Sequence, residues 1–320
     1  MRAVFYETHG DAQVLQVGEL DKPACGPEQV LVEVAAAGVN PIDRRLRAGE
    51  LTEYIQRTFP VVPGFDVSGR IAEVGAAVTD WQVGDEIMGL AFTWSIQHGT
   101  YAEFAPVDAA AIAPKPANAS FVQAAGIPLV SLTAWQSLLE FGQLGPGKTV
   151  LIQAGAGGVG SVAIPMAKHL GAKVYTTASA ANADYVKALG ADVVIDYQNE
   201  SYEAAILNAE PEGVDMVLEA LLADGTDEAA IRITKTGGAV AYMNNEPPNM
   251  PDIADRNIRA EFIHHRADGA MLAELGALYE QGVLSLPQTE TLPLESAVEA
   301  HLRSESRRTR GKLVLSINDL

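Results

Sequence analysis

The chain has 320 residues, of which 48% are hydrophobic and 20% are charged, and its formal net charge is -19 at pH 7. This composition is that of a globular protein, and at about 150 residues per domain the length predicts two domains. The anionic surface would repel a nucleic-acid backbone, the single cysteine excludes an internal disulfide, and no apolar run nears the roughly 18 residues that span a bilayer. We therefore expect a cytoplasmic protein that binds neither nucleic acid nor a membrane.

The first 120 residues read as an irregular β domain. Short segments of β composition are separated by glycine and proline turns. They lie at residues 3–7, 30–39, 66–76, 84–91 and 100–107.

From residue 121 the pattern changes to alternating helices and strands. Residues 121–141 are apolar at helical spacing, and short apolar strands follow at 149–155, 172–179, 191–197, 214–221 and 238–244. Apolar strands separated by amphipathic helices predict an α/β fold, a doubly wound parallel sheet of the Rossmann type. After a helix at 271–282, the tail returns to strand composition. We therefore expect a domain at 121–281, and a first domain at 1–120 that is rejoined by 282–320.

A glycine-rich turn follows the strand at 149–155. Gly155, Gly157 and Gly160 stand in the G-x-G-x-x-G frame between a strand and a helix, within a βαβ unit of about 30 residues. Gly155 allows the tight turn, Gly157 and Gly158 let backbone N–H groups approach a pyrophosphate, and Gly160 allows close packing. The helix N-terminus adds unpaired donors, so this turn predicts a dinucleotide site. Pro165 is expected to bend or shorten the helix.

The end of the next strand favours NADPH over NADH. An enzyme that uses NAD places a carboxylate there for the ribose hydroxyls, but no acid occurs between Gly160 and Asp184. The hydroxyls of Thr177 and Ser179 could instead donate to a 2′-phosphate. No Lys or Arg occurs from Val174 to Tyr185 to add a positive charge.

The basic run near the C-terminus is a further candidate for an anion. It contains Arg303, Arg307, Arg308, Arg310 and Lys312. We expect either a solvated loop before the last strand or a small anion site.

Eight ordered motifs resemble one known family over nearly the whole chain. Among them are AAAGVNPIDRRLRAG, PVVPGFDVSGRIAEVG, AGAGGVG and RGKLVLSI. The chain resembles the zinc-independent quinone oxidoreductases of the medium-chain dehydrogenase/reductase superfamily. The resemblance implies a GroES-like β domain, an inserted Rossmann domain, and a homodimer through the edge of the Rossmann sheet, at residues 237–244 and 260–265.

The same resemblance implies that no metal is bound. Zinc-dependent relatives have Cys where Asn40 stands and His where Phe65 stands, and phenylalanine cannot ligate zinc. The histidines do not restore a site, since His264 and His265 are adjacent on a predicted strand and would diverge. Without zinc to polarise an alcohol, reduction of an activated acceptor is the favoured direction.

The family's cofactor residues map onto this chain one by one. Asn40 and Thr133 would lie near the nicotinamide, and Gly157, Gly158 and Val159 near the pyrophosphate. Ser179 and Tyr197 would lie near the adenosine phosphate, and Arg307, or its neighbour Arg308, would supply the positive charge at the 2′-phosphate. A lysine that often fills this pocket is replaced here by Ala180 or Asn182, depending on the alignment.

We hypothesise that hydride passes from NADPH to a quinone or to the β-carbon of an α,β-unsaturated carbonyl. Asn40 could bond the nicotinamide ribose or the substrate oxygen, and Tyr54 is a candidate proton donor or stacking group, with solvent as the alternative donor. A sensor, scaffold or crystallin-like protein that binds NADPH without turnover is an alternative. An enoyl-thioester reductase is another, ranked lower because only Arg57 offers a charge for its phosphates.

Overall fold

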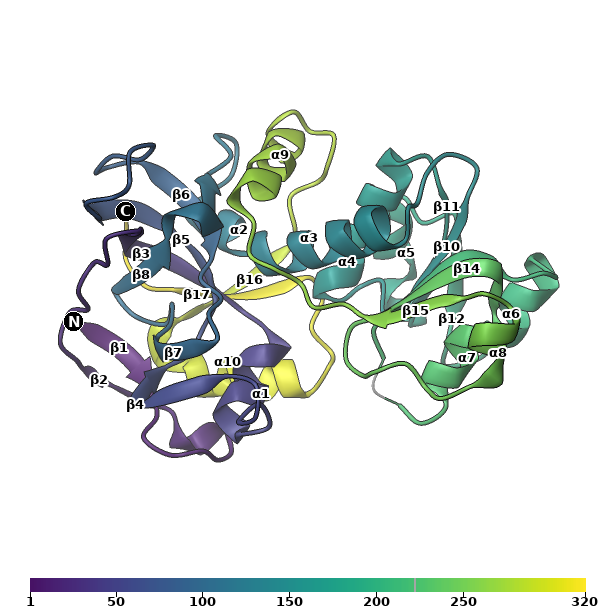
Figure 1. Cartoon of the computed structure of the whole chain (residues 1–320), viewed down its shortest axis with the longest axis horizontal. Helices are drawn as coiled ribbons and strands as arrows, with labels where there is room; N and C mark the ends of the chain where they lie inside the picture. Colours follow the sequence, from purple (N-terminus) through teal and green to yellow (C-terminus); the bar gives the residue numbers. More distant parts are fainter. Residues whose placement is uncertain (222) are drawn as a thin grey trace. The chain divides into compact units, whose positions relative to one another are not determined.

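A computed structural model describes residues 1–221 and 223–320, and contacts within the chain divide it into two units (Figure 1). One unit comprises residues 1–132 and 266–320, and the other comprises residues 133–265. Within the described residues, no helix combines the length and apolar character needed to cross a membrane.

The second unit is built on a parallel sheet with the strand order β12-β11-β10-β13-β14-β15. This is the classical Rossmann order 3-2-1-4-5-6, which confirms the predicted doubly wound fold. The strand order reverses between β10 and β13, so a ligand crevice is expected at the carboxyl ends of these two strands. The strands are β10 (Thr149–Ile152), β11 (Lys173–Ala178), β12 (Val193–Asp196), β13 (Val214–Glu219), β14 (Thr234–Tyr242) and β15 (Arg259–Phe262).

Helices cover both faces of this sheet (Figure 1). On one face α6, α7 and α8 enclose an apolar cluster that includes Val217, Ile231 and Tyr242, while α4 contacts β10 and β11. Because both faces are covered, the strands are almost continuously apolar. The helices are α4 (Gly158–His169), α5 (Ala183–Ala188), α6 (Tyr202–Ala209), α7 (Thr226–Arg232) and α8 (Pro251–Asp255). Helix α4 continues four residues past Pro165, so the expected shortening at this proline does not occur.

The first unit contains a seven-stranded sheet in the order β16-β17-β3-β5-β6-β9, with β8 also paired to β3. Two small two-stranded sheets, β1-β2 and β4-β7, accompany it, as predicted for an irregular GroES-like β domain. The strands are β1 (Arg2–Phe5), β2 (Gln16–Glu19), β3 (Gln29–Val39), β4 (Gln56–Val62), β5 (Asp66–Val74), β6 (Glu86–Leu90), β7 (Ser95–His98), β8 (Phe104–Asp108), β9 (Ile112–Pro114), β16 (Thr289–Pro293) and β17 (Lys312–Ser316).

The unit boundaries differ from those expected at residues 120 and 282. Helix α2 (Phe121–Ala125) contacts β3 and β5, and α9 (Gly269–Glu280) contacts β9, so both belong to the first unit. Helical periodicity shows that a helix has an apolar face, but it does not show which sheet that face covers. The expected helix at 121–141 is broken into α2, α3 (Pro128–Trp135) and a π-helix (Gln136–Phe141), and the tail contains an additional helix, α10 (Ala297–Glu305).

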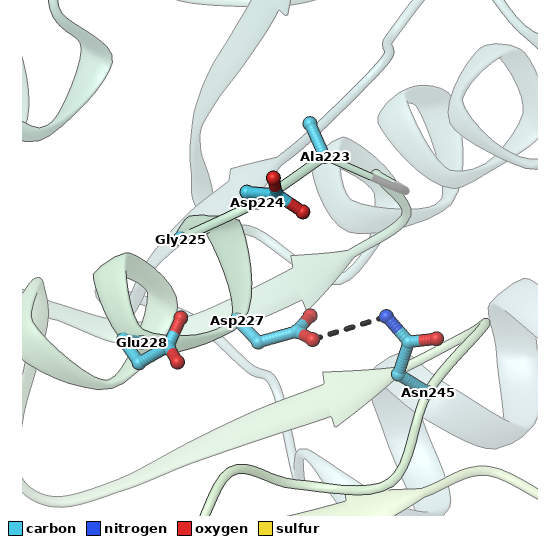
Figure 2. Close-up of a pocket in the computed structure, with 6 residues that line it drawn as sticks. All are labelled: Ala223, Asp224, Gly225, Asp227, Glu228 and Asn245. Carbon is cyan, nitrogen blue, oxygen red and sulfur yellow. Dashed lines mark hydrogen bonds between the residues drawn. The ribbon is translucent and has the colours of Figure 1, made fainter.

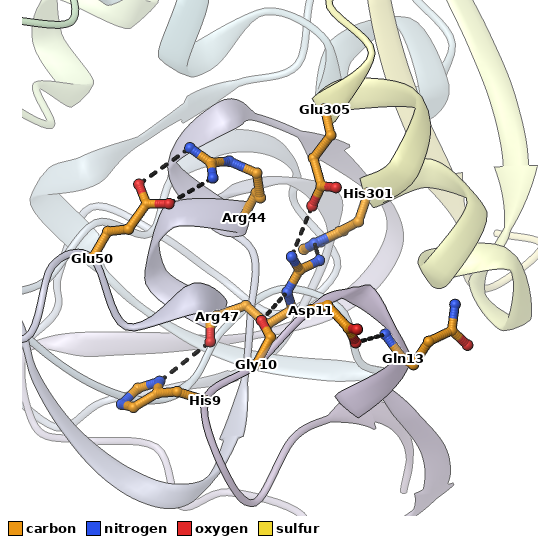
Figure 3. Close-up of polar contacts among 9 residues, drawn as sticks. All are labelled: His9, Gly10, Asp11, Gln13, Arg44, Arg47, Glu50, His301 and Glu305. Atoms are coloured by element: carbon orange, nitrogen blue, oxygen red, sulfur yellow. Dashed lines mark hydrogen bonds and ion pairs between the residues drawn. The ribbon is translucent and has the colours of Figure 1, made fainter.

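A buried polar network joins α1 (Pro41–Ala48) to α10 (Figure 3). The guanidinium of Arg47 lies 3.0 Å from His301 Nδ1 and 2.7 Å from Glu305 Oε1, and its Nε donates to the Gly10 carbonyl over 3.2 Å. The network fixes α1 in the first unit, and Asn40 stands at the N-terminus of that helix.

Candidate functional site

The glycine-rich turn connects β10 to α4 in a conformation that only small residues allow. A Cβ added at Gly155 would lie 2.0 Å from Thr176 Oγ1, and one added at Gly160 would lie 2.4 Å from the Ala154 carbonyl oxygen. At Gly157, the N-cap of α4, a Cβ would meet only the Ala154 oxygen at 3.3 Å. Gly155 and Gly160 are therefore required by packing, whereas Gly157 keeps the helix N-terminus open to a ligand.

Thr177 braces this turn from the neighbouring strand β11. Its hydroxyl oxygen accepts from the Ala154 N–H over 2.9 Å, and its carbonyl accepts from the Gly155 N–H over 3.0 Å. The residue is only 1% exposed. Thr177 thus has a structural contact that sequence alone did not predict, while its contact with a 2′-phosphate stays a prediction.

Ser179 and Tyr197 follow the ends of β11 and β12. Ser179 is half-buried and makes no side-chain capping bond to the turn that follows it, whereas Tyr197 is 55% exposed. Both lie at the carboxyl-terminal edge of the sheet, where the predicted adenosine phosphate would bind.

Glu219 ends β13 at the reversal of strand order, a position that sequence reasoning missed. Its side chain is buried, its Oε1 accepts from the Leu221 N–H over 2.9 Å, and its Oε2 has no hydrogen-bond partner. Burial raises the pKa of Glu219 to about 7, and the nearby Asp227 carboxylate adds to this rise. An acid at the end of a buried strand, in VDMVLEAL, was the available signal.

An acidic pocket of about 450 Å³ lies just beyond β13 (Figure 2). It is lined by Ala223, Asp224, Gly225, Asp227, Glu228 and Asn245. Asn245 Nδ2 donates to Asp227 Oδ2 over 3.0 Å, and burial raises the pKa of Asp227. Carboxylates repel phosphate groups, so this pocket is not suited to the pyrophosphate of a dinucleotide.

Thr133 begins the second unit, near the end of α3. Its backbone carbonyl accepts from Ser137 Oγ over 2.7 Å, whereas its own buried Oγ1 has no hydrogen-bond partner. A buried hydroxyl without a partner is costly, so the group is suited to a ligand that can donate or accept a hydrogen bond.

Asn40 is positioned by the start of α1 in the first unit. It is the N-cap residue, Pro41 occupies the first turn, and the Asn40 backbone N–H donates to Asp43 Oδ2 over 2.7 Å. Tyr101 donates its hydroxyl proton to the same oxygen over 2.9 Å. Burial raises the pKa of Asp43 to about 7 despite these hydrogen bonds.

The side chain of Asn40 lies between a buried cation and a buried anion. Its Nδ2 donates to Asp66 Oδ2 over 2.8 Å, and Lys312 Nζ donates to its Oδ1. Lys312 also lies 3.2 Å from Asp66 Oδ2, and the three residues are at most 3% exposed. The expectation of a solvated loop or an anion site is therefore wrong for Lys312, because β17 carries this lysine into the interior.

Phe65 begins a row of aromatic side chains. Its ring centroid lies 5.3 Å from that of Phe92, which lies 5.1 Å from that of Trp94. Phe65 is fully buried and Trp94 is 60% exposed, so the row runs from the interior to the surface. Tyr54 is 68% exposed and lies outside the buried cluster around Asn40.

Over the described residues, no group of three or more His, Cys, Asp or Glu side chains is arranged to hold a metal ion. Strand β15 ends at Phe262, so His264 and His265 lie beyond the strand on which we expected them. The buried His301 is engaged by Arg47.

Arg307 is exposed after α10, with a backbone φ of 56°, and it belongs to the first unit. Ser179 and Tyr197 belong to the second unit. Arg307 and these two residues thus come from different units, and the contact of Arg307 with a 2′-phosphate stays a prediction.

Two family models match the sequence. The model described as alcohol dehydrogenase GroES-like domain matches residues 26–117, which include Asn40 and Phe65, and the one described as zinc-binding dehydrogenase matches residues 189–315.

Named relatives are similar over the whole chain. The chain is 32% identical to a 2-methylene-furan-3-one reductase from Solanum lycopersicum and 32% identical to an NADPH-dependent alkenal/one oxidoreductase from Arabidopsis thaliana; each match covers 98% of this chain and 79% of the relative. The crystal structure of Escherichia coli quinone oxidoreductase complexed with NADPH superposes with a TM-score of 0.88 at 26% identity, covering 99% of this chain and all of the other. These matches confirm the predicted family: the chain belongs to the medium-chain dehydrogenase/reductase superfamily, together with quinone oxidoreductases and enone reductases.

Proposed function

We propose that this protein is a zinc-independent reductase that uses NADPH to reduce a quinone or an α,β-unsaturated carbonyl. The observation that carries the proposal is the glycine turn at the reversal of strand order, where Gly155 and Gly160 leave no room for a side chain. The names of the two plant enone reductases and of the NADPH-bound quinone oxidoreductase support both the cofactor and the class of acceptor.

The residues present fit a dinucleotide. Gly157, Gly158 and Val159, at the start of α4, would line the pyrophosphate. The Gly157 N–H already donates to the Ala154 carbonyl over 2.9 Å, so the N–H groups of Gly158 and Val159 are the donors proposed for it, together with the positive dipole of the helix N-terminus. The unpartnered hydroxyl of Thr133 would pair with a hydroxyl near the nicotinamide. Ser179, Tyr197 and Arg307 are proposed for the adenosine phosphate, and NADPH when bound supplies the hydride.

Asn40 would contribute a hydrogen bond to the oxygen of the acceptor or of the nicotinamide ribose. Its amide is buried and hydrogen-bonded to Asp66 and Lys312, and a donor fixed in a water-poor site stabilises developing negative charge more than a donor in water does. Neither Asn40 nor Phe65 provides the thiolate or imidazole of a catalytic zinc site, which supports the zinc-independent part of the proposal.

A proton must reach the reduced acceptor, and Tyr54 and solvent are the two candidate donors. Tyr54 is 68% exposed, so the residue lies largely in solvent. This exposure favours solvent as the donor, and a Tyr54→Phe variant that keeps its turnover would support that assignment.

We further propose that the protein is a homodimer that pairs through β15. Within the described sheet β14 lies between β13 and β15, which corrects the expectation that residues 237–244 form an edge, whereas β15 is an edge strand. The backbone groups of an edge strand are open to pairing with a second copy.

The function is tested by mixing NADPH-loaded protein with a panel of quinones and enones in a stopped-flow spectrometer. Oxidation of bound NADPH that persists after a chelator, with no stoichiometric zinc by elemental analysis, is the expected result. If no acceptor oxidises the cofactor, the sensor or scaffold alternative replaces the reductase. An Asn40→Ala variant with parental rate and affinity would remove the role assigned to Asn40.

A further inference from the structure

The amide of Asn40 is held in one orientation by two buried charges. We propose that Lys312 is a positioning residue that fixes Asn40 so that it presents a hydrogen-bond donor to the ligand. The proposal rests on the proposed function, and it assigns a role to a residue of the C-terminal strand that lies far from Asn40 in sequence.

The orientation follows from the donor and acceptor chemistry of the two neighbours. An ammonium group can only donate and a carboxylate can only accept, so Lys312 selects the Oδ1 side of the amide and Asp66 selects the Nδ2 side. A flipped amide would place its oxygen against the Asp66 carboxylate and its N–H groups against the Lys312 ammonium. Both contacts would be repulsive, and burial leaves little solvent to screen them.

This orientation determines what Asn40 can offer a ligand. An amide nitrogen carries two N–H groups, and one of those on Asn40 is committed to Asp66 over 2.8 Å. The oxygen accepts from the Lys312 ammonium, and the second N–H is the donor that neither neighbour uses. The ligand atom that would match this N–H is an acceptor, such as a carbonyl oxygen on a quinone or an enone, or a ribose hydroxyl oxygen.

The surroundings of Lys312 keep the ammonium in place. Its Nζ also donates to the Val39 carbonyl over 3.1 Å, and β17 pairs with β3 so that Leu313 stands opposite Val39. Asp66 is held in turn by the Leu129 N–H, which donates to its Oδ1 over 2.7 Å. These hydrogen bonds hold both neighbours of the amide in place, so a ligand would meet an amide whose direction is already set.

The main experiment is a double-mutant cycle on turnover. Lys312→Met is expected to lower kcat for quinone or enone reduction by about tenfold, the effect of losing one hydrogen bond from a charged group. Lys312→Arg, which keeps a charged donor, should recover part of this loss. In an Asn40→Ala background, Lys312→Met should have no further effect on kcat, because Lys312 acts through Asn40.

A matched control separates positioning from stability. Lys115 is also largely buried, with Nζ bonded to the Ala119 carbonyl over 2.8 Å and paired with Glu86 over 3.2 Å. Lys115→Met removes a buried ammonium and its ion pair with the more exposed Glu86 within the same unit, and it should lower the melting temperature without lowering kcat. The proposal would be overturned if kcat were unchanged in Lys312→Met. It would also be overturned if the fold-loss of kcat in the double variant equalled the product of the losses in the two single variants.

A second measurement does not depend on activity. The side-chain amide resonances of Asn40, assigned in an NMR spectrum by their loss in Asn40→Ala, should move in Lys312→Met and stay in place in Lys115→Met. If the parent reduces no acceptor but the resonances move as expected, the proposed function fails and the held orientation stands. Resonances that stay in place in Lys312→Met would contradict the orientation itself.

Discussion

Arg47 Nη1 donates a hydrogen bond to His301 Nδ1 over 3.0 Å inside the first unit, where both side chains are buried (Figure 3). Arginine has no acceptor, so Nδ1 of His301 must accept and the imidazole must be neutral. Burial, together with the charges of Arg47 and Arg44, lowers the pKa of His301 to about 3. This single contact therefore links the stability of the first unit to pH.

We predict that His301 makes the first unit acid-sensitive. In the unfolded chain this histidine binds a proton below a pH of about 6.5, whereas in the folded unit it does not. The contribution of His301 to the free energy of unfolding is therefore at its full value above that pH and is lost as the pH falls toward 3. The slope approaches about 1.4 kcal/mol per pH unit. His301→Gln, which keeps an acceptor for Arg47 but cannot titrate, should flatten this dependence. Urea unfolding followed through Trp81 and Trp94 in a Trp135→Phe background reports on this unit. Parallel pH curves for parent and variant would contradict the prediction.

Glu219 should make the second unit less stable as the pH rises, which is the opposite of the pH dependence expected from His301. Burial raises the pKa of Glu219 to about 7. The protonated carboxyl therefore contributes its full stabilisation below the ordinary carboxyl pKa, and this stabilisation is lost as the pH rises through 7. Glu219→Gln should therefore stabilise the second unit above neutral pH, by on the order of 2 kcal/mol, and have little effect in acid. Unfolding is followed through Trp135 in a chain whose other two tryptophans are replaced.

Glu203 supplies the control for Glu219. Hydrogen bonds from Arg232 lower the pKa of Glu203, so this carboxylate stabilises the unit above its ordinary pKa and stops doing so in acid. Glu203→Gln should lose stability at neutral pH, where Glu219→Gln gains it. The same sign of effect for both variants would rule out the assignment for Glu219.

Substitutions in the glycine turn should separate packing from binding. Gly155→Ala places a methyl group 2.0 Å from Thr176 Oγ1, and we expect it to lower both the stability of the second unit and the affinity for NADPH, the latter at least tenfold. The Cβ added in Gly157→Ala would lie 3.3 Å from the Ala154 carbonyl oxygen and near no other atom. This variant should lower the affinity for NADPH with little loss in the stability of the second unit. Gly145→Ala, in the same unit with nothing within 4 Å of the added Cβ, is the control. Unfolding curves and NADPH titrations check all three, and parental NADPH affinity in Gly155→Ala would remove the turn from the proposed site.

The choice between NADPH and NADH should depend on Arg307. A charge-assisted bond to the 2′-phosphate is lost in Arg307→Ala, so the Kd for NADPH should rise by about tenfold while the Kd for NADH is unchanged. The neighbouring Arg308→Ala makes the same change in net charge and should not discriminate between the cofactors. Equal effects of both variants on NADPH would refute the specific contact of Arg307.

The fold of the second unit could be predicted because its signals are local. Apolar strands of four to nine residues, helices between them and the order of the glycines all lie within short windows of sequence. The placement of α2 and α9 could not be predicted, because it depends on which of two apolar sheets a helix covers. Helix α10 was missed because its short sequence, AVEAHLRSE, follows turn-like residues.

The site could be predicted only in part, because its contacts join segments that lie far apart in the sequence. Asn40 and Phe65 were identified from a motif, but the partners of Asn40 come from β5 and β17. Lys312 stands in a run of arginines, so its sequence context indicates solvent, and only the pairing of β17 with β3 places it in the interior. Glu219 was missed because its significance depends on the order of strands in the sheet.

Strand β17 lies between β16 and β3 in the seven-stranded sheet, and it contains residues 312–316. During synthesis on the ribosome, residues 133–265 emerge complete before this strand does, so the second unit can fold while the first still lacks an inner strand. Until β17 is added, Asp66 has no Lys312 to neutralise it, and only one of the two buried charges that orient the Asn40 amide is present. A polypeptide released before residue 312 would therefore contain the whole second unit and lack the residue proposed to position Asn40.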